Sequence, residues 1–309
     1  MKVFIKLLIS LGLVFLLVRT IDFETLLPVF SDANVKLLSL VACAYVSASV
    51  FEILKLYVLV VKRISFLKTI KLVYIGLFFN NLLPTNIGGD SYKIFLLQKG
   101  MGLNKSLAIV LFDRVFGITT LLFWFAVYLL FQPHFLTLVH EKISFPNHLN
   151  IMVVCVAVLV VSIAVLLIVS NKFKTVFYNK IYKHIAEILS VYRTFSRTKL
   201  FVQFALASAY HLSRLFAFTL LVLAFHGSIV WYNIIPVLSL VAIVSILPIS
   251  FGGLGLREGT IVVALVIVGV DYEVAISVAA VNLFVLWFKS AIGLAIFTTT
   301  RHSKLTADS

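Results

Sequence analysis

The chain has 309 residues, of which 62% are hydrophobic and only 12% are charged, and its mean hydropathy is +1.12. A domain of this composition would not stay dissolved in water, which excludes a soluble enzyme or a soluble binding module. The formal net charge of +14 would suggest nucleic acid in a soluble protein. Here the basic residues lie between apolar segments, so we expect no nucleic-acid partner and interpret them as membrane topology signals.

The first apolar segment, Val3 to Val18, follows two lysines and therefore has the outline of a signal peptide. Charged residues, not a small-residue cleavage site, come after it. We interpret it as an uncleaved first transmembrane helix that places the N-terminus in the cytoplasm.

About 20 apolar residues are needed to cross a bilayer as a helix. Six segments meet this requirement: Val3 to Val18 with its flanks, Val35 to Val61, Ser106 to Phe131, Ile151 to Ser170, Leu200 to Phe225 and Val274 to Thr298. Lysines and arginines concentrate at 62–71, in the loop 171–199 and at 301–304. The positive-inside rule places these segments and both termini in the cytoplasm.

Two further apolar segments, 72–97 and 234–270, are each interrupted by Pro and Gly. Each arm beside an interruption has about 10 to 15 residues, roughly 15 to 22 Å of helix, which is shorter than a hydrocarbon core of about 30 Å. Each segment is therefore expected to form a re-entrant helical hairpin, with two full spans as the alternative. The fold class is an all-α polytopic membrane protein with six full spans and two hairpins, or with eight or more spans.

The two interruptions share the pattern Leu-Pro-x-x-x-Gly-Gly, at 83–89 and at 247–253. The loop assignment makes the hairpins enter from opposite sides of the membrane. This pattern predicts an inverted repeat within one integral membrane domain (1–309), with residues 35–131 as the first repeat and 200–299 as the second. The substrate site is then expected near the midplane, between the broken helices.

Charged residues stand close to both interruptions and inside the third span. Because an ionisable group at a helix centre costs about 2.5–3.5 kcal/mol, such residues normally pair and face a cavity. A tip of this kind also exposes backbone N–H groups at a helix N-terminus, which attract a phosphate. The candidate substrate-binding residues are Asn81, Pro84, Asn86, Gly88, Gly89, Asp90, Lys93, Asp113, Arg114, Pro248, Gly252, Gly253, Arg257 and Glu258.

The same residues have a structural alternative. Asp113 or Glu258 would then neutralise Lys93, Arg114 or Arg257 and hold the hairpins in place. For Arg257, next to a glycine-rich tip, we favour contact with a phosphate or headgroup. His211, Arg214 and Lys289 lie within spans and are interpreted as weaker candidates with a structural role.

No nucleophile–base pair, phosphate-binding loop or metal-ligand spacing occurs in the sequence. We therefore expect no enzymatic activity, no cofactor and no metal. Cys43 and Cys155 lie in apolar segments and are expected to be packing residues. The loop 171–199 is expected to lie on the cytoplasmic membrane surface as an amphipathic helix, with partner docking as the alternative.

The segment Asn80 to Lys93, the pair Asp113-Arg114 and the segment Leu247 to Glu258 together resemble the transmembrane domain of lysylphosphatidylglycerol synthases. That family includes stand-alone flippase-like proteins, some associated with polyprenyl-phosphate glycosyltransferases. The resemblance covers nearly the whole chain and implies a protein of the bacterial inner membrane that moves a lipid between leaflets.

Three positions depart from the family pattern. Lys93 stands where Arg is common, Asp113 stands where Glu is common, and Phe251 stands where Pro often precedes the second Gly-Gly. The first two changes keep the charge, whereas the third alters the expected geometry of the second tip. The soluble aminoacyl-transfer domain has no counterpart in these 309 residues, so aminoacylation is not expected.

Two functions remain open. The first is a flippase-like transporter for an anionic phospholipid, an aminoacyl-phosphatidylglycerol or a polyprenyl-phosphate-linked lipid. The second is a non-transporting membrane subunit that scaffolds a polyprenyl-phosphate glycosyltransferase or another lipid enzyme. The lipid, the direction of movement, the energy source and the oligomeric state are not specified by the sequence.

Overall fold

The structure is a computed structural model, and it describes residues 28–60, 64–82, 88–135, 137, 190–192, 195–246 and 250–300. Within these ranges every regular element is a helix and no strand occurs, which confirms the all-α class for this part of the chain. The elements are α3 (Val35–Val60), α4 (Phe66–Leu82), α5 (Gly88–Met101), α6 (Leu103–Phe131), α10 (Arg197–Ala224), η2 (Trp231–Asn233), α11 (Ile234–Ile246), η3 (Phe251–Gly253), α12 (Leu256–Ile267) and α13 (Tyr272–Thr299).

Four of these helices, α3, α6, α10 and α13, are long and apolar enough to cross a membrane. They have 26 to 29 residues, or about 40 Å of helix against a hydrocarbon core of about 30 Å. Large apolar side chains cover their outer surfaces, with Leu130 80% exposed and Phe284 69% exposed. Four of the six predicted spans are thereby confirmed, whereas Val3 to Val18 and Ile151 to Ser170 lie outside the described residues.

Both predicted interruptions separate shorter helices. The arms α4 and α5 flank residues 83–87, and α11 and α12 flank 247–255, with 12 to 17 residues in each arm. At 1.5 Å per residue the arms reach about 18–25 Å, which is too short for each to cross the core alone. The first pair is longer than the predicted 72–97, because Ser65 caps α4 through the Lys68 amide and the helix starts before the apolar segment.

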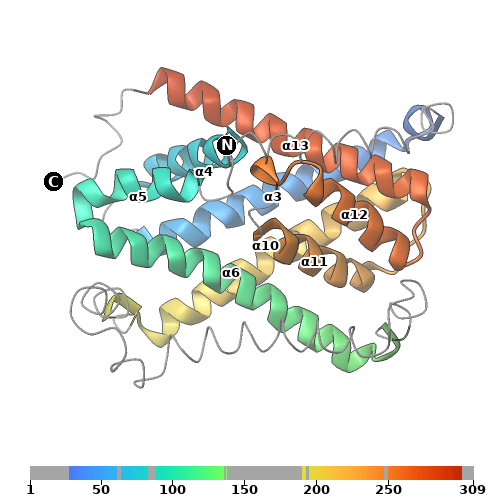
Figure 1. Cartoon of the computed structure of the whole chain (residues 1–309), viewed down its shortest axis with the longest axis horizontal. Coiled ribbons are helices and arrows are strands. Elements are labelled where there is room, and N and C mark those ends of the chain that lie inside the picture. Colours follow the sequence, from blue (N-terminus) through green and yellow to red (C-terminus); the bar gives the residue numbers. More distant parts are fainter. Residues whose placement is uncertain are drawn as a thin grey trace.

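The four long helices run in two directions: α3 and α13 point one way, and α6 and α10 point the other way and cross each other (Figure 1). Asn34 on the N-terminal side of α3 donates to the carbonyl of Ala224 at the end of α10, so these two helices are antiparallel. Tyr45 of α3 bonds to Asn282 of α13, and Glu52 of α3 bonds to Lys289 of α13. The partners are 237 residues apart in both pairs, so α3 and α13 are parallel. These relative directions match those expected from the loop assignment.

The apolar core has two parts, one around each pair of short helices. One cluster joins Val41 of α3 and Leu121 of α6 to the second half of α10, the first part of α11, the second half of α12 and the first turns of α13. The other joins the second half of α3 to α4, α5 and the first half of α6. Glu52 and Lys55 of α3 and Asp113 and Arg114 of α6 lie where the two clusters meet, and we call these charged residues the polar layer.

Only the end of the basic loop 171–199 lies within the described residues. There, Tyr192 donates to the carbonyl oxygen of Ala108 near the start of α6, at 3.0 Å. Burial raises the pKa of Tyr192 to about 12, so the hydroxyl keeps its proton at neutral pH. This contact fixes the chain to α6 just before α10 begins.

Candidate functional site

The two interruptions meet inside the molecule. Gly252, Gly253 and Gly255 have φ angles of 59°, 81° and 78°, a region that favours glycine. A Cβ atom on Gly252 would lie 3.2 Å from the carbonyl oxygen of Asn81, so the second tip packs directly against the end of α4 (Figure 1). Segments about 170 residues apart in the sequence therefore form one junction.

The short helices α4 and α5 pack with their backbones in direct contact. A Cβ atom on Gly89 would overlap the carbonyl oxygen of Gly76. The Gly89 amide donates to Asn80 Oδ1 at 2.7 Å, and Phe79 stacks on Tyr92 with ring centroids 4.8 Å apart. These contacts make α4 and α5 an antiparallel pair.

At each tip, one backbone N–H group that we expected to be available to an anion already donates a hydrogen bond within the protein. Gly89 donates to the Asn80 side chain, and Gly255 donates to Glu258 Oε2 at 2.8 Å. Other polar atoms at the junction are unsatisfied: Asn81 Nδ2 and the hydroxyl of Ser250, itself only 2% exposed, have no hydrogen-bond partner among the described residues. Gly88 begins α5, whereas Pro84, Asn86 and Pro248 lie outside the described residues.

Asp90 is the carboxylate of the first tip, and two cations share it. Arg114 Nη1 lies 2.7 Å from Asp90 Oδ2, and Lys93 Nζ lies 3.7 Å from Asp90 Oδ1. Lys93 packs over Gly76, where a Cβ atom would lie 2.9 Å from Lys93 Cε. Lys93 and Arg114 are therefore paired through Asp90 and not through Asp113 or Glu258.

Asp113 instead pairs with a residue that sequence reasoning did not single out. Lys55 Nζ of α3 lies 3.4 Å from Asp113 Oδ1, and Gln203 of α10 donates to the same oxygen at 3.4 Å. One turn away on α3, Glu52 pairs with Lys289 at 3.2 Å. The polar layer therefore includes two charged residues of the second predicted span.

Arg257 and Glu258 form a local pair at the second tip. Arg257 Nε and Nη2 both donate to Glu258 Oε1, at 2.9 and 2.7 Å, while Glu258 Oε2 caps α12. This is the structural alternative considered in the sequence analysis, in which Glu258 neutralises Arg257.

Taken together, cations outnumber carboxylates in the described interior. The cations are Lys55, Lys93, Arg114, Arg214, Arg257 and Lys289, and the carboxylates are Glu52, Asp90, Asp113 and Glu258. No cluster of three or more metal-ligating side chains occurs in the described ranges. The arrangement suits an anionic group better than a metal ion.

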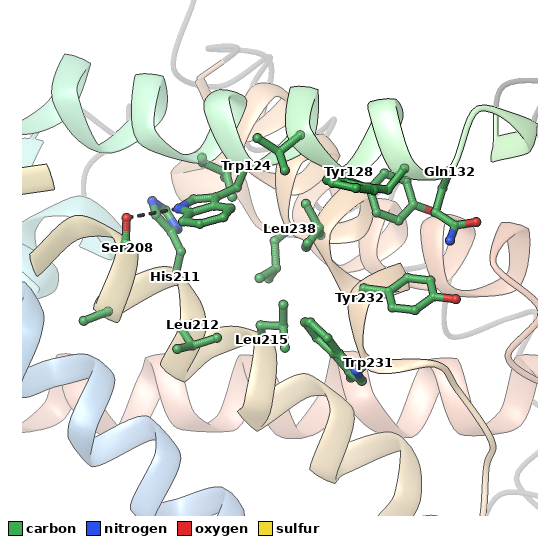
Figure 2. A pocket seen from close by; sticks show the side chains of 15 residues that line it. Trp124, Tyr128, Gln132, Ser208, His211, Leu212, Leu215, Trp231, Tyr232 and Leu238 are labelled. Atoms are coloured by element: carbon green, nitrogen blue, oxygen red, sulfur yellow. Dashed lines mark hydrogen bonds between the residues drawn. The ribbon is translucent and has the colours of Figure 1, made fainter. Parts of the chain in front are cut away.

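An apolar cavity of about 660 Å³ lies between α6, α10 and the η2–α11 segment (Figure 2). Tyr128, Trp231 and Tyr232 line one end, and Trp124, bonded to Ser208 at 3.0 Å, lines the other with His211. No sequence pattern predicted this cavity, because its walls come from three segments far apart in the chain.

His211 joins the cavity to the polar layer. Its Nε2 donates to the carbonyl oxygen of Gly117 at 3.0 Å, and Nδ1 has no partner in the described part of the chain. Lys55 Nζ lies 3.3 Å from the position of a Cβ atom on Gly117. About two turns of α6 separate Asp113 and Arg114 from Leu121, the first residue of this helix that lines the cavity.

Comparison with known proteins identifies the chain at the family level. The family model described as "Lysylphosphatidylglycerol synthase TM region" matches residues 3–293. A search of curated proteins and a search of solved structures each gave no match. With its long apolar helices, the chain is a multi-pass membrane protein of the lysylphosphatidylglycerol synthase transmembrane-region family, which indicates a membrane lipid-related role.

Proposed function

We propose that the protein is a flippase-like transporter that moves an anionic lipid between the leaflets of a bacterial inner membrane, with both termini in the cytoplasm. The cargo classes are an anionic phospholipid, an aminoacyl-phosphatidylglycerol or a polyprenyl-phosphate-linked lipid. The observation that carries the proposal is that His211, in the wall of the apolar cavity, bonds to Gly117, which lies beside Lys55 of the cation-rich polar layer. Such a site suits a molecule with a charged headgroup and a hydrocarbon chain.

The headgroup would enter the polar layer beside the junction of the two tips. Arg114 is its most accessible paired cation, with a side chain 33% exposed, and a guanidinium binds phosphate oxygens in bidentate geometry. Unsatisfied Asn81 and Ser250 would supply further hydrogen bonds at the junction. The hydrocarbon chain would occupy the cavity, where Trp231 and Tyr232 mark the membrane interface.

Alternating access would follow from an inverted repeat. Each predicted repeat consists of a long helix, a broken pair of short helices and a second long helix. The corresponding helices α3 and α10 are antiparallel, as inversion requires. We propose that the broken pairs are re-entrant hairpins that open the site to one leaflet at a time.

Arg114→Gln is expected to abolish most transport without unfolding the protein. Asp90 keeps Lys93 as a partner, so the carboxylate of Asp90 is not left unpaired. A hydrogen bond to a charged group contributes about 1.5–3 kcal/mol, so loss of this contact to the headgroup should lower the transport rate roughly tenfold or more. The measurement is movement of fluorescent phosphatidylglycerol in proteoliposomes, with label in the outer leaflet bleached by dithionite.

The matched control is Lys99→Gln, which removes an exposed cation near the end of α5. It is expected to transport at the wild-type rate. Wild-type transport by Arg114→Gln would contradict a headgroup site at the Asp90 pair.

Ala209→Phe is expected to slow transport by filling the cavity that Ala209 lines. Thermal stability should stay the same or rise, because the added ring occupies empty apolar space. Ala205→Phe, at an exposed position on the same helix, is the control and should have no effect. Normal transport by a folded Ala209→Phe variant would remove the cavity from the lipid path.

The second function, a membrane subunit that holds a polyprenyl-phosphate glycosyltransferase or another lipid enzyme, is favoured by one observation. Arg257, Lys93 and Arg114 are already paired with carboxylates, as expected of groups that lock the fold. In that case wild-type proteoliposomes would show no more lipid movement than protein-free liposomes.

A further inference from the structure

Arg214 differs from every other cation of the described interior. Lys55, Lys93, Arg114, Arg257 and Lys289 each have a carboxylate within 4 Å, whereas no carboxylate of the described residues reaches Arg214. It stands ten residues before Ala224, the end of α10, about 15 Å from the end of the helix. A cation at this depth normally has a partner, because its insertion is costly.

Aromatic rings hold the guanidinium at that depth. Arg214 Cζ lies 6.0 Å from the centroid of Tyr210 and 5.8 Å from that of Phe218, one turn before and one turn after it. The side chain therefore does not extend to either membrane surface. Ring faces attract the cation, but they offer no oxygen to its N–H donors.

A second donor is nearby on α13. Tyr45 of α3 packs against the same apolar cluster as Leu215 and Phe218, the neighbours of Arg214 on α10. Its hydroxyl donates to Asn282 Oδ1 at 3.1 Å, and the amide nitrogen of Asn282 has no bond within the described residues. The three helices α3, α10 and α13 thus place a guanidinium and an amide N–H group around one apolar cluster, with no carboxylate of the described residues paired to either.

This cluster is displaced from the charged layer. Lys55, which pairs with Asp113, also lies 5.4 Å from the centroid of the Tyr210 ring, so Tyr210 contacts both the polar layer and Arg214. Tyr45 precedes Glu52 by seven residues on α3, about 10 Å along the helix. The cluster therefore lies toward the ends where α3 begins and α10 finishes.

We propose that Arg214 and Asn282 form a second binding station for a phosphate-type anion, about 10 Å along the bundle from the charged layer. Its ligand is the phosphate of an anionic lipid or free phosphate, which share the same chemistry. As a step on a lipid path it rests on the proposed function, but binding of the anion can be tested independently of transport.

Binding to the full chain in detergent would be measured by calorimetry with three probes. Dioctanoyl phosphatidylglycerol carries phosphate and chains, dioctanoylglycerol carries chains alone, and inorganic phosphate carries neither glycerol nor chains. Arg214→Gln is expected to bind phosphatidylglycerol about tenfold more weakly than wild type or worse. Arg214→Lys should restore part of the affinity, and Arg197→Gln, an exposed arginine on the same helix, should bind normally.

The probes identify the source of the anion. Binding of phosphatidylglycerol but not inorganic phosphate supports a lipid headgroup, and equal dependence of both on Arg214 supports a free-phosphate site. Unchanged phosphatidylglycerol affinity in Arg214→Gln overturns the station. Without ligand, Arg214→Gln should unfold at the wild-type temperature or higher. A lower temperature with unchanged affinity would show that Arg214 serves only packing.

The proteoliposome assay separates this inference from the proposed function. If wild type moves lipid and Arg214→Gln both binds and moves it normally, the station is wrong and transport stands. If wild type moves no lipid but Arg214→Gln still loses affinity, the anion site stands and the transporter proposal is wrong.

Discussion

Gly89→Ala is expected to destabilise the protein by roughly 2–3 kcal/mol, the upper range for overpacking a close contact. The added Cβ would overlap the carbonyl oxygen of Gly76, which is backbone and has no rotamer to escape into. Separation of α4 from α5 would also break the bond from the Gly89 amide to Asn80. The thermal midpoint and the SDS concentration of half-unfolding in micelles would both fall.

Gly259→Ala is the matched control, because Gly259 also lies within a helix that follows a tip but has nothing within 4 Å of its Cβ position. Alanine is favoured over glycine in a helix by up to about 1 kcal/mol, so this variant should be neutral or slightly more stable. Equal midpoints for the two variants would show that α4 and α5 do not pack at this distance.

The sequence predicted the elements of this fold that depend on local composition. Four apolar spans and two helix interruptions lie where hydropathy, Pro and Gly placed them. Gly252 and Gly253 belong to the second predicted interruption, and both have positive φ angles. These features follow from properties of single residues, so a single sequence is sufficient to find them.

The partners of the charged residues could not be predicted in this way. Asp113 pairs with Lys55, and Glu52 pairs with Lys289, because α3 crosses α6 and α13 at particular levels. A signal was present: apart from Lys36 at its start, Glu52 and Lys55 are the charged residues of an otherwise apolar helix. The cavity had no such signal, since it depends on how three helices diverge.

Neutralising either member of the Lys55–Asp113 pair is expected to cost about 3–5 kcal/mol, because one buried charge is left without its partner. Lys55 is the most buried cation among the ion pairs of the described residues, with a side chain 8% exposed. Asp113→Leu should therefore be the more damaging of the two single variants. Lys55→Met leaves Asp113 with the Gln203 amide, which offsets part of the loss.

The double variant Lys55→Met/Asp113→Leu separates a structural pair from a functional one. Apolar side chains of similar volume often replace a buried ion pair without loss of stability, so the double variant should recover most of the wild-type midpoint. Transport of fluorescent phosphatidylglycerol should nevertheless stay low, because the polar layer has lost Lys55, which lies beside Gly117, the partner of His211 in the cavity wall. Recovery of both stability and transport would show that this pair only locks α3 to α6, and that the headgroup is bound elsewhere.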